Sequence, residues 1–149
     1  PAHETASGKI YLREDAPPAI LHREDGPAVI RANGDMEWWI DGQLHREGAP
    51  AVIRSDASFW FCHHRCHRED GPAIERADGS KEWKFQDLPH REDGPCTIMG
   101  DGFERGWAIH GKLMSAAEHA KYCESRTTPT AVLVPCTLTV PKLMFAKKT

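Results

Sequence analysis

A nine-residue phrase that occurs four times constrains this chain more than any other feature. In its first copy it reads His-Arg-Glu-Asp-Gly-Pro-Ala-Val-Ile, over residues 22–30. The copies begin, at steps of 23, 22 and 23 residues, with His22, His45, His67 and His90. A second marker follows at steps of 22, 23 and 24 residues, in Trp38, Trp60, Trp83 and Trp107. Two markers that share one period predict a repeat architecture.

The pattern inside one repeat predicts a β-hairpin. Residues 28–31 form a short β-prone run, and residues 32–35 contain Asn-Gly, which supplies the positive φ angles of a tight hairpin turn. Residues 36–40 then read as a second strand. Gly26-Pro27 cannot lie inside a central strand, because proline has no N–H to give to a ladder. The chain is therefore predicted to be all-β, an array of about four hairpin repeats of 22–24 residues that forms an elongated sheet.

The 149 residues are predicted to form one domain with four parts. Residues 1–21 read as an N-terminal cap, in which Leu12 to Ile20 is a damaged copy of the phrase. The four hairpin repeats occupy residues 22–113. Ser115 and Glu118 have the spacing of a capping box, which predicts a short capping helix within residues 114–125. Residues 126–149 read as a tail, either with edge strands or without fixed structure.

Strand alternation divides the second strand of each repeat into two faces. The face that carries the four tryptophans is the regular one and is predicted to be the core. The opposite face is the candidate surface for protein binding, with Glu37, Trp39, Phe59, Phe61, Glu82 and Lys84. Exposed aromatic clusters often mark protein interfaces. In the alternative interpretation the helix or the tail covers this face, and its aromatic residues belong to the core.

The recurring histidines are predicted to be structural. His22, His45, His67 and His90 occupy the same loop in every repeat, as do the tryptophans at their own position, and a framework needs every copy whereas a function seldom does. The adjacent Glu-Asp residues of the phrase point apart in an extended segment and form no carboxylate pair. We therefore expect no catalytic residues.

The most unusual stretch combines cysteines and histidines between residues 62 and 67. Cys62, His64, Cys66 and His67 are soft ligands of the kind that Zn²⁺ takes. Against a zinc site, Cys62 falls at a strand position that other repeats fill with apolar residues, and His67 belongs to the repeated framework. We expect no bound metal and no cofactor, and zinc remains an alternative.

Composition narrows the classes of partner. The net charge is −3, the pI is about 6.3, and acidic and basic residues are interleaved, which argues against nucleic acid and a membrane surface as partners. Five cysteines without the spacing of a disulfide framework predict a reducing, cytoplasmic setting.

The hairpin repeat resembles the variant MORN-type repeats. The likeness covers residues 22–113 and lies in Gly-Pro-Ala, a turn, and then Trp-x-apolar-x-Gly. In particular it resembles the His-Arg-x-Asp-Gly-Pro-Ala repeat proteins of phages, giant viruses and some bacteria. That resemblance implies an interaction scaffold without catalytic residues. We expect a non-enzymatic module, encoded by a virus or mobile element, that binds a host protein and blocks it sterically, for example as an anti-CRISPR or other inhibitor of a defence complex.

Two alternatives from other classes stay open. The first is a self-assembling scaffold, a homo-oligomer that forms through the open sheet edges. The second is a zinc-dependent hydrolase, or a zinc-stabilised module, that uses the cluster from Cys62 to His67.

Overall fold

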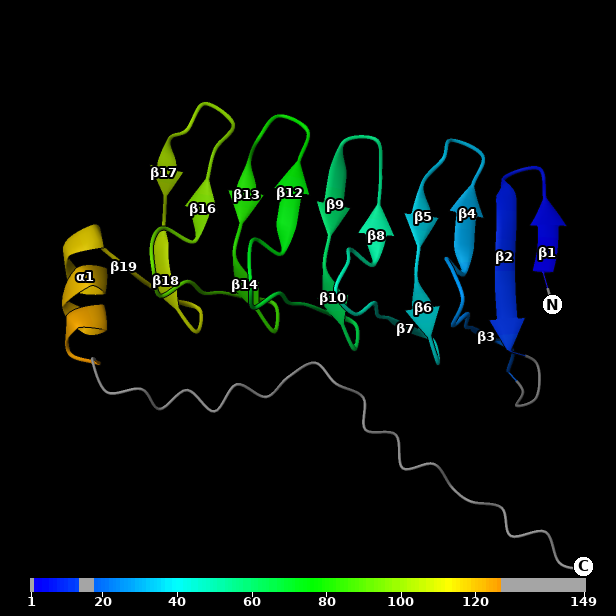
Figure 1. Ribbon diagram of the computed structural model, residues 1–149, viewed down its shortest axis with the longest axis horizontal. Helices are drawn as coiled ribbons and strands as arrows, with labels where there is room; N and C mark the ends of the chain where they lie inside the picture. Colours follow the sequence, from blue (N-terminus) through cyan, green and yellow to red (C-terminus); the bar gives the residue numbers. More distant parts are fainter. Residues whose placement is uncertain (1, 14–17, 127–149) are drawn as a thin grey trace, which may run out of the picture.

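The structure, a computed structural model, describes residues 2–13 and 18–126 and is all-β with one short C-terminal helix (Figure 1). The predicted fold class is therefore confirmed. Residues 127–149 of the tail predicted over 126–149, with its suggested edge strands, lie outside the described residues, as do residues 14–17 of the N-terminal cap. Within the described part of the chain, no helix has the length and apolar character needed to span a bilayer.

One antiparallel sheet runs the length of the array and takes two strands from each repeat (Figure 1). In spatial order its strands are β1 (Ala2–Thr5), β2 (Gly8–Arg13), β4 (Val29–Arg31), β5 (Met36–Glu37), β8 (Val52–Ile53), β9 (Ala57–Phe59), β12 (Ile74–Arg76), β13 (Lys81–Glu82), β16 (Thr97–Ile98) and β17 (Glu104–Arg105). A further strand, β3 (Ile20–Leu21), pairs with β2.

A row of small hairpins lies beside this sheet, one for each repeat (Figure 1). They are β6 (Trp39–Ile40) with β7 (Gln43–Leu44), β10 (Phe61–Cys62) with β11 (Arg65–Cys66), β14 (Lys84–Phe85) with β15 (Leu88–Pro89), and β18 (Trp107–Ile109) with β19 (Lys112–Met114). In the first copy, the single second strand predicted over 36–40 is thus two strands separated at Trp38. Each repeat consequently contains two hairpins rather than the one that the sequence predicts.

Bulky and small residues alternate across the sheet at the level of the tryptophans. The backbone N–H of Trp60 donates to the carbonyl of Ala73 at 2.8 Å, and Trp38 and Trp83 make the same bond to Ala51 and Cys96. The small residues are almost completely buried, with exposed fractions of 0% for Ala51 and Ala73. The pattern fits the close packing of protein interiors, because a methyl group or thiol leaves room for the indole on the neighbouring strand.

An arginine from the following loop lies over each of the first three tryptophan rings. The distance from the guanidinium carbon to the ring centroid is 3.9 Å for Arg46 over Trp38, 4.2 Å for Arg68 over Trp60 and 3.9 Å for Arg91 over Trp83. The tryptophans are therefore half-buried under a cation, and the expectation of a tryptophan core was wrong in that respect. Among the described residues, no large side chain falls below 2% exposure, as a single-layer sheet would lead one to expect.

The remaining residues of the phrase hold that arginine in place. In repeats one, three and four its Nε donates to the aspartate two residues later at 2.7 Å, as Arg68 does to Asp70. Its Nη1 donates to the carbonyl of the loop proline, at 3.2 Å for Pro72. A Cβ on Gly71 would lie 2.9 Å from the Arg68 guanidinium carbon, so the glycine after the aspartate leaves room for the cation.

The chain reaches the end of the array in α1 (Ala116–Glu124), the helix that the capping box predicts. The Ser115 hydroxyl accepts from the Glu118 N–H at 3.2 Å, and the Glu118 carboxylate accepts from the Ser115 N–H at 2.8 Å. The helix packs against β18, and the buried His119 places its Nε2 2.6 Å from the Arg91 carbonyl oxygen. Helix and last repeat are thereby joined.

Candidate functional site

The four histidines of the phrase join the loops to the row of small hairpins. Each ring Nδ1 accepts from the first N–H of a small-hairpin turn: His22 from Asp41 at 3.1 Å, His45 from His63 at 3.4 Å, His67 from Gln86 at 3.3 Å, and His90 from His110 at 3.1 Å. The four imidazoles thus occupy successive steps of the array rather than one shared cavity. This arrangement supports a structural role for them.

Two of these histidines lie against a second histidine ring, tilted in the pair His45–His63 and stacked in the pair His90–His110. The ring centroids of His45 and His63 are 4.7 Å apart, and those of His90 and His110 are 4.3 Å apart with planes at 16°. Burial lowers the pKa of His45, and the neighbouring His63 lowers it further; burial and His110 have the same effects on His90. Both rings are therefore held neutral, in the form that accepts at Nδ1.

From the lowered pKa values of His45 and His90 we predict that the protein loses stability in mild acid. A histidine whose pKa is lowered by folding takes up a proton on unfolding, so its contribution is complete above the unfolded pKa of about 6.5 and is lost as the pH falls below it. We expect the free energy of unfolding in urea to fall between about pH 7.5 and about pH 5.5, above the range in which carboxylates titrate.

The matched control for this prediction replaces the two neighbouring histidines, His63 and His110, and keeps the turns in which they lie. In a His63→Gln/His110→Gln variant, glutamine stands at the turn position that Gln86 holds in the third repeat. The decline in unfolding free energy over the same pH interval should be smaller, because one cause of each lowered pKa is gone. An unchanged decline in the unfolding free energy of the variant would show that the pairs His45–His63 and His90–His110 do not contribute to the pH dependence.

The suggested zinc ligands do not converge. Cys66 is buried with its Sγ 3.9 Å from the Ala73 carbonyl oxygen, and burial raises the pKa of its thiol to about 11. His67 accepts from Gln86, and the exposed His64 ring lies 5.9 Å from that of Trp39. The expected alternative set of Cys62, His64, Cys66 and His67 is therefore wrong as a coordination site.

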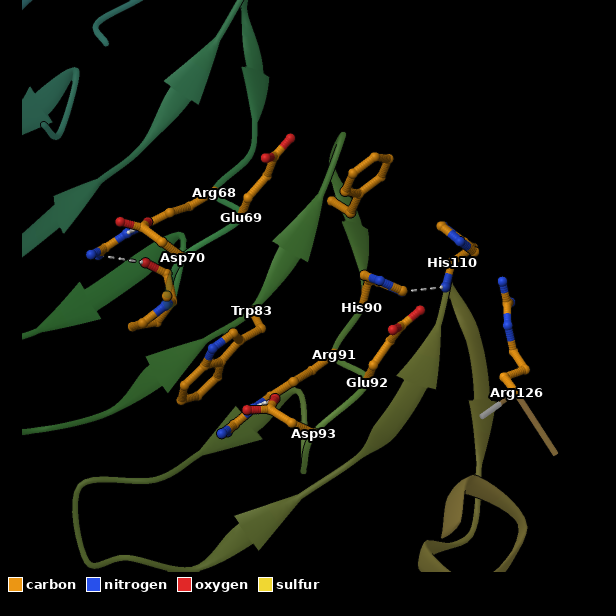
Figure 2. A pocket seen from close by; sticks show the side chains of 13 residues that line it. Arg68, Glu69, Asp70, Trp83, His90, Arg91, Glu92, Asp93, His110 and Arg126 are labelled. Carbon is orange, nitrogen blue, oxygen red and sulfur yellow. Dashed lines mark hydrogen bonds and ion pairs between the residues drawn. The ribbon is translucent and has the colours of Figure 1, made fainter. Parts of the chain in front are cut away.

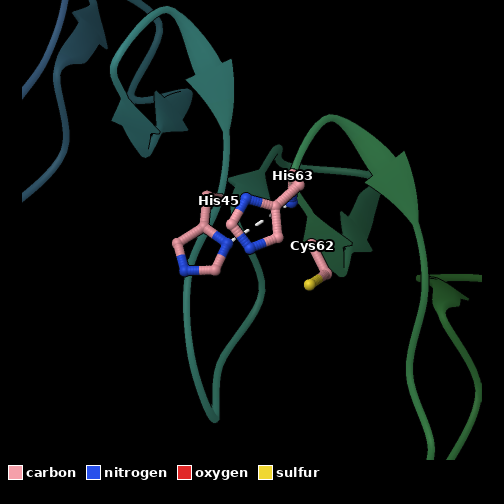
Figure 3. Close-up of side chains that lie close together, drawn as sticks. All are labelled: His45, Cys62 and His63. Atoms are coloured by element: carbon pink, nitrogen blue, oxygen red, sulfur yellow. Dashed lines mark hydrogen bonds between the residues drawn. The ribbon is translucent and has the colours of Figure 1, made fainter. Parts of the chain in front are cut away.

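A different trio does come together in the second repeat. Ligand atoms of His45, Cys62 and His63 all lie within 4.8 Å of one another (Figure 3). The Cys62 sulfur belongs to a disulfide, and the His45 Nδ1 already accepts from the His63 N–H. We assign no metal to this trio, because two of its three donor atoms are engaged within the protein.

Two grooves lie between successive loops of the phrase. The larger one, about 680 Å³, separates the third and fourth loops, and its Arg68 and Arg91 are each paired with an aspartate (Figure 2). The smaller one, about 330 Å³, lies between the second and third loops and is lined by Arg46, Trp60 and Phe61 among others. The larger groove is built from groups that the repeated framework already uses.

The candidate binding residues share one face, but they differ in exposure. Glu37 is only 8% exposed and is held by Arg31 at 2.6 Å and by the Trp39 indole N–H at 3.0 Å. Glu82 is half-buried between Arg76 at 2.7 Å and Lys84 at 3.6 Å. These carboxylates are engaged within the chain, and the aromatic residues of this face, Trp39, Phe59 and Phe61, are half-buried.

The second repeat departs from its neighbours on that face. Phe59 stands where the first and third repeats have Glu37 and Glu82, and Arg54 lies over its ring at 5.5 Å instead of pairing with a carboxylate. Phe61 stands where the third repeat has Lys84. Both phenylalanines are half-buried and pack against a small cluster of buried residues, Cys66, Ala73 and Ile74.

The second repeat also lacks the aspartate of its loop. Residues 45–50 read His-Arg-Glu-Gly-Ala-Pro, so Gly48 and Ala49 replace the usual Asp-Gly. Arg46 still lies over Trp38 and donates to the Pro50 carbonyl at 3.1 Å, but no carboxylate of residues 2–13 or 18–126 pairs with it. Sequence comparison of the four loops was sufficient to find this departure, but its consequence required the geometry.

Comparison with known proteins found no match: no family model matches the chain, and no match was found among the curated proteins or the solved structures.

Proposed function

We propose that this chain is a non-enzymatic protein-binding module whose contact surface centres on the second repeat. It acts by occupying the surface of another protein, and the resemblance to viral repeat proteins favours a host protein, such as a defence complex, as the partner. One observation carries the proposal. The second repeat keeps the framework of histidine, tryptophan and arginine. It has Phe59 and Phe61 where the third repeat has the paired Glu82 and Lys84, and no carboxylate in the described part of the chain pairs with Arg46.

The physical argument is that the second repeat has phenylalanine at both positions, whereas the third repeat has Glu82 and Lys84 there and the fourth has Gly106 and Ala108. Half-exposed aromatic rings next to an arginine are the composition typical of the residues that dominate binding energy at protein interfaces. The surrounding interleaved charges would set specificity and the rate of encounter more than affinity.

A variant that converts the second repeat to the third tests the proposal. Phe59→Glu/Phe61→Lys places at these positions the residues found at Glu82 and Lys84, and Arg54 is positioned to pair with the new carboxylate as Arg76 pairs with Glu82. We expect the variant to fold with a lower thermal midpoint than the parent, because both rings leave the cluster of Cys66, Ala73 and Ile74, and to lose about tenfold or more in affinity for the partner.

Quantitative affinity capture from a host lysate, with identification by mass spectrometry, provides the readout. Trp39→Ala serves as a second probe of the same face. A partner that is captured equally by the parent and by both folded variants would contradict a contact surface on the second repeat. Unfolding of both variants would place these aromatic residues in the core instead.

Self-assembly is the second candidate function, and the open sheet edges favour it. All four residues of β1 are exposed, and among the described strands β17, at the other end, pairs with β16 alone. Unpaired strand edges can template pairing with another chain. Sedimentation at several concentrations tests this candidate, because edge-to-edge assembly predicts an average mass that rises steadily with concentration.

A further inference from the structure

We infer that Arg46 is a receptor for a carboxylate side chain, an aspartate or glutamate presented by the partner protein. The inference rests on the proposed function and deepens it, because it names the chemistry of the partner at one atom. The second loop offers the arginine site that the other three repeats fill from within the chain.

The other repeats show what this site accepts. Arg23, Arg68 and Arg91 each direct Nε to an aspartate Oδ1 at 2.7 Å, while the guanidinium lies on an aromatic ring and Nη1 donates to a proline carbonyl. In the second repeat the ring and the carbonyl are in place and the aspartate is missing. A guanidinium fixed by two contacts in advance binds a carboxylate with little further loss of conformational freedom.

The loop backbone agrees with this interpretation. Gly48 has φ of +67°, whereas the aspartates at this position in the other three loops, Asp25, Asp70 and Asp93, lie outside the left-handed region. A side chain at position 48 is therefore disfavoured in the present conformation, and Gly48 adds no side-chain atoms beside Arg46. Burial without a counter-ion lowers the pKa of Arg46, whereas the pKa of Arg23 is raised by its bond to Asp25.

The surroundings of Arg46 suit a side chain from a protein. Arg46 lines the smaller groove together with Trp60 and Phe61, which offer apolar contact to the stem of an incoming residue. The acidic groups of the groove have neighbours of their own: Asp70 pairs with Arg68, Glu69 lies 3.4 Å from the His67 Nε2, and Glu47 lies 4.0 Å from that of His45. Arg46 is thus the group of the groove with an unmet demand for negative charge.

Titration with a capped aspartate, followed by the arginine Nε–H signals in NMR spectra of the whole chain, tests the site without the partner. We expect N-acetyl-aspartate methylamide to shift the Arg46 signal saturably and to leave those of Arg23, Arg68 and Arg91 unchanged. The corresponding capped asparagine, which has no charge, should bind about tenfold more weakly or worse. Equal shifts of all four arginines, or no shift of Arg46, would overturn the inference.

Two reciprocal variants serve as matched controls. Gly48→Asp/Ala49→Gly restores the loop sequence of the other repeats and should abolish the Arg46 response, because this sequence allows the backbone conformation of the other loops, in which the aspartate occupies Nε. Asp25→Gly/Gly26→Ala transfers the second loop to the first repeat and should create a response at Arg23. A restored loop that binds capped aspartate as well as the parent does would also refute the site.

The same restored loop separates this inference from the proposed function. If the partner binds the parent and the restored variant equally, the module stands and the carboxylate receptor at Arg46 falls. If capped aspartate binds and no partner protein is retained, the receptor stands and the module falls. If the parent dimerises in sedimentation and the restored variant does not, the carboxylate comes from a second copy, which overturns the assignment to another protein.

Discussion

Replacing Trp60 with alanine is expected to lower the free energy of unfolding by about 3 kcal/mol, as loss of a large aromatic side chain does in other proteins. The indole lies in the middle of the array, beneath Arg68 at 4.2 Å and beside the fully buried Ala73. Its removal exposes that methyl group and takes the ring face from the guanidinium, an interaction that contributes about 0.5–2 kcal/mol. Urea unfolding followed by far-ultraviolet circular dichroism measures the loss.

Trp39→Ala is the matched control for this prediction. Trp39 belongs to the preceding repeat. Within the described part of the chain no arginine lies over it, and its indole N–H donates to the buried Glu37 at 3.0 Å. Its loss should cost about half as much as that of Trp60. Equal destabilisation by the two substitutions would show that the arginine–tryptophan stack adds nothing to the stability of the array.

The sequence was sufficient to predict the elements that depend on local chemistry. Asn33-Gly34 predicted the turn between β4 and β5, and the spacing of Ser115 and Glu118 predicted α1 with both capping bonds. Such signals depend on residues within one turn of each other, so they can be interpreted without knowledge of the fold. The all-β repeat followed from the 22–24-residue period in the same way.

The position of the arginines over the tryptophan rings was not predicted, although the sequence contains a signal for it. Trp38 and Arg46, Trp60 and Arg68, and Trp83 and Arg91 are each eight residues apart, so the two residues keep a fixed separation in three repeats. Alternation along a strand says which side chains share a face, but it does not say what covers them. The first member could not be found this way, because Tyr11 takes the place of tryptophan beneath Arg23 at 3.9 Å.

Glu37 shows a second limit of strand alternation. A charged residue opposite the tryptophan face predicts exposure, yet Glu37 is buried, because Arg31 and the Trp39 indole satisfy both carboxylate oxygens. A charge can be buried when it is paired and hydrogen-bonded. The partner that makes this possible is six residues away and was visible in the sequence only as an ordinary surface arginine.

Ala73→Leu is expected to destabilise the chain by about 2 kcal/mol, through overpacking rather than through loss of a contact. Ala73 has 0% exposure, its carbonyl accepts from the Trp60 N–H at 2.8 Å, and its N–H donates to the carbonyl of Glu82, the residue before Trp83, at 2.8 Å. Ala73 lies in a buried cluster with Cys66 and Ile74, against which Phe59 and Phe61 pack, so a larger side chain at position 73 must displace one of these neighbours. Chemical unfolding measures the loss of unfolding free energy.

Ala73→Cys is the control, because Cys96 occupies the equivalent place beside Trp83 with 2% exposure. The thiol should therefore be tolerated within about 1 kcal/mol. A leucine at position 73 that proved as stable as the cysteine would mean that the sheet opens at this level without cost, and that the alternation of bulky and small residues does not determine the packing of neighbouring repeats.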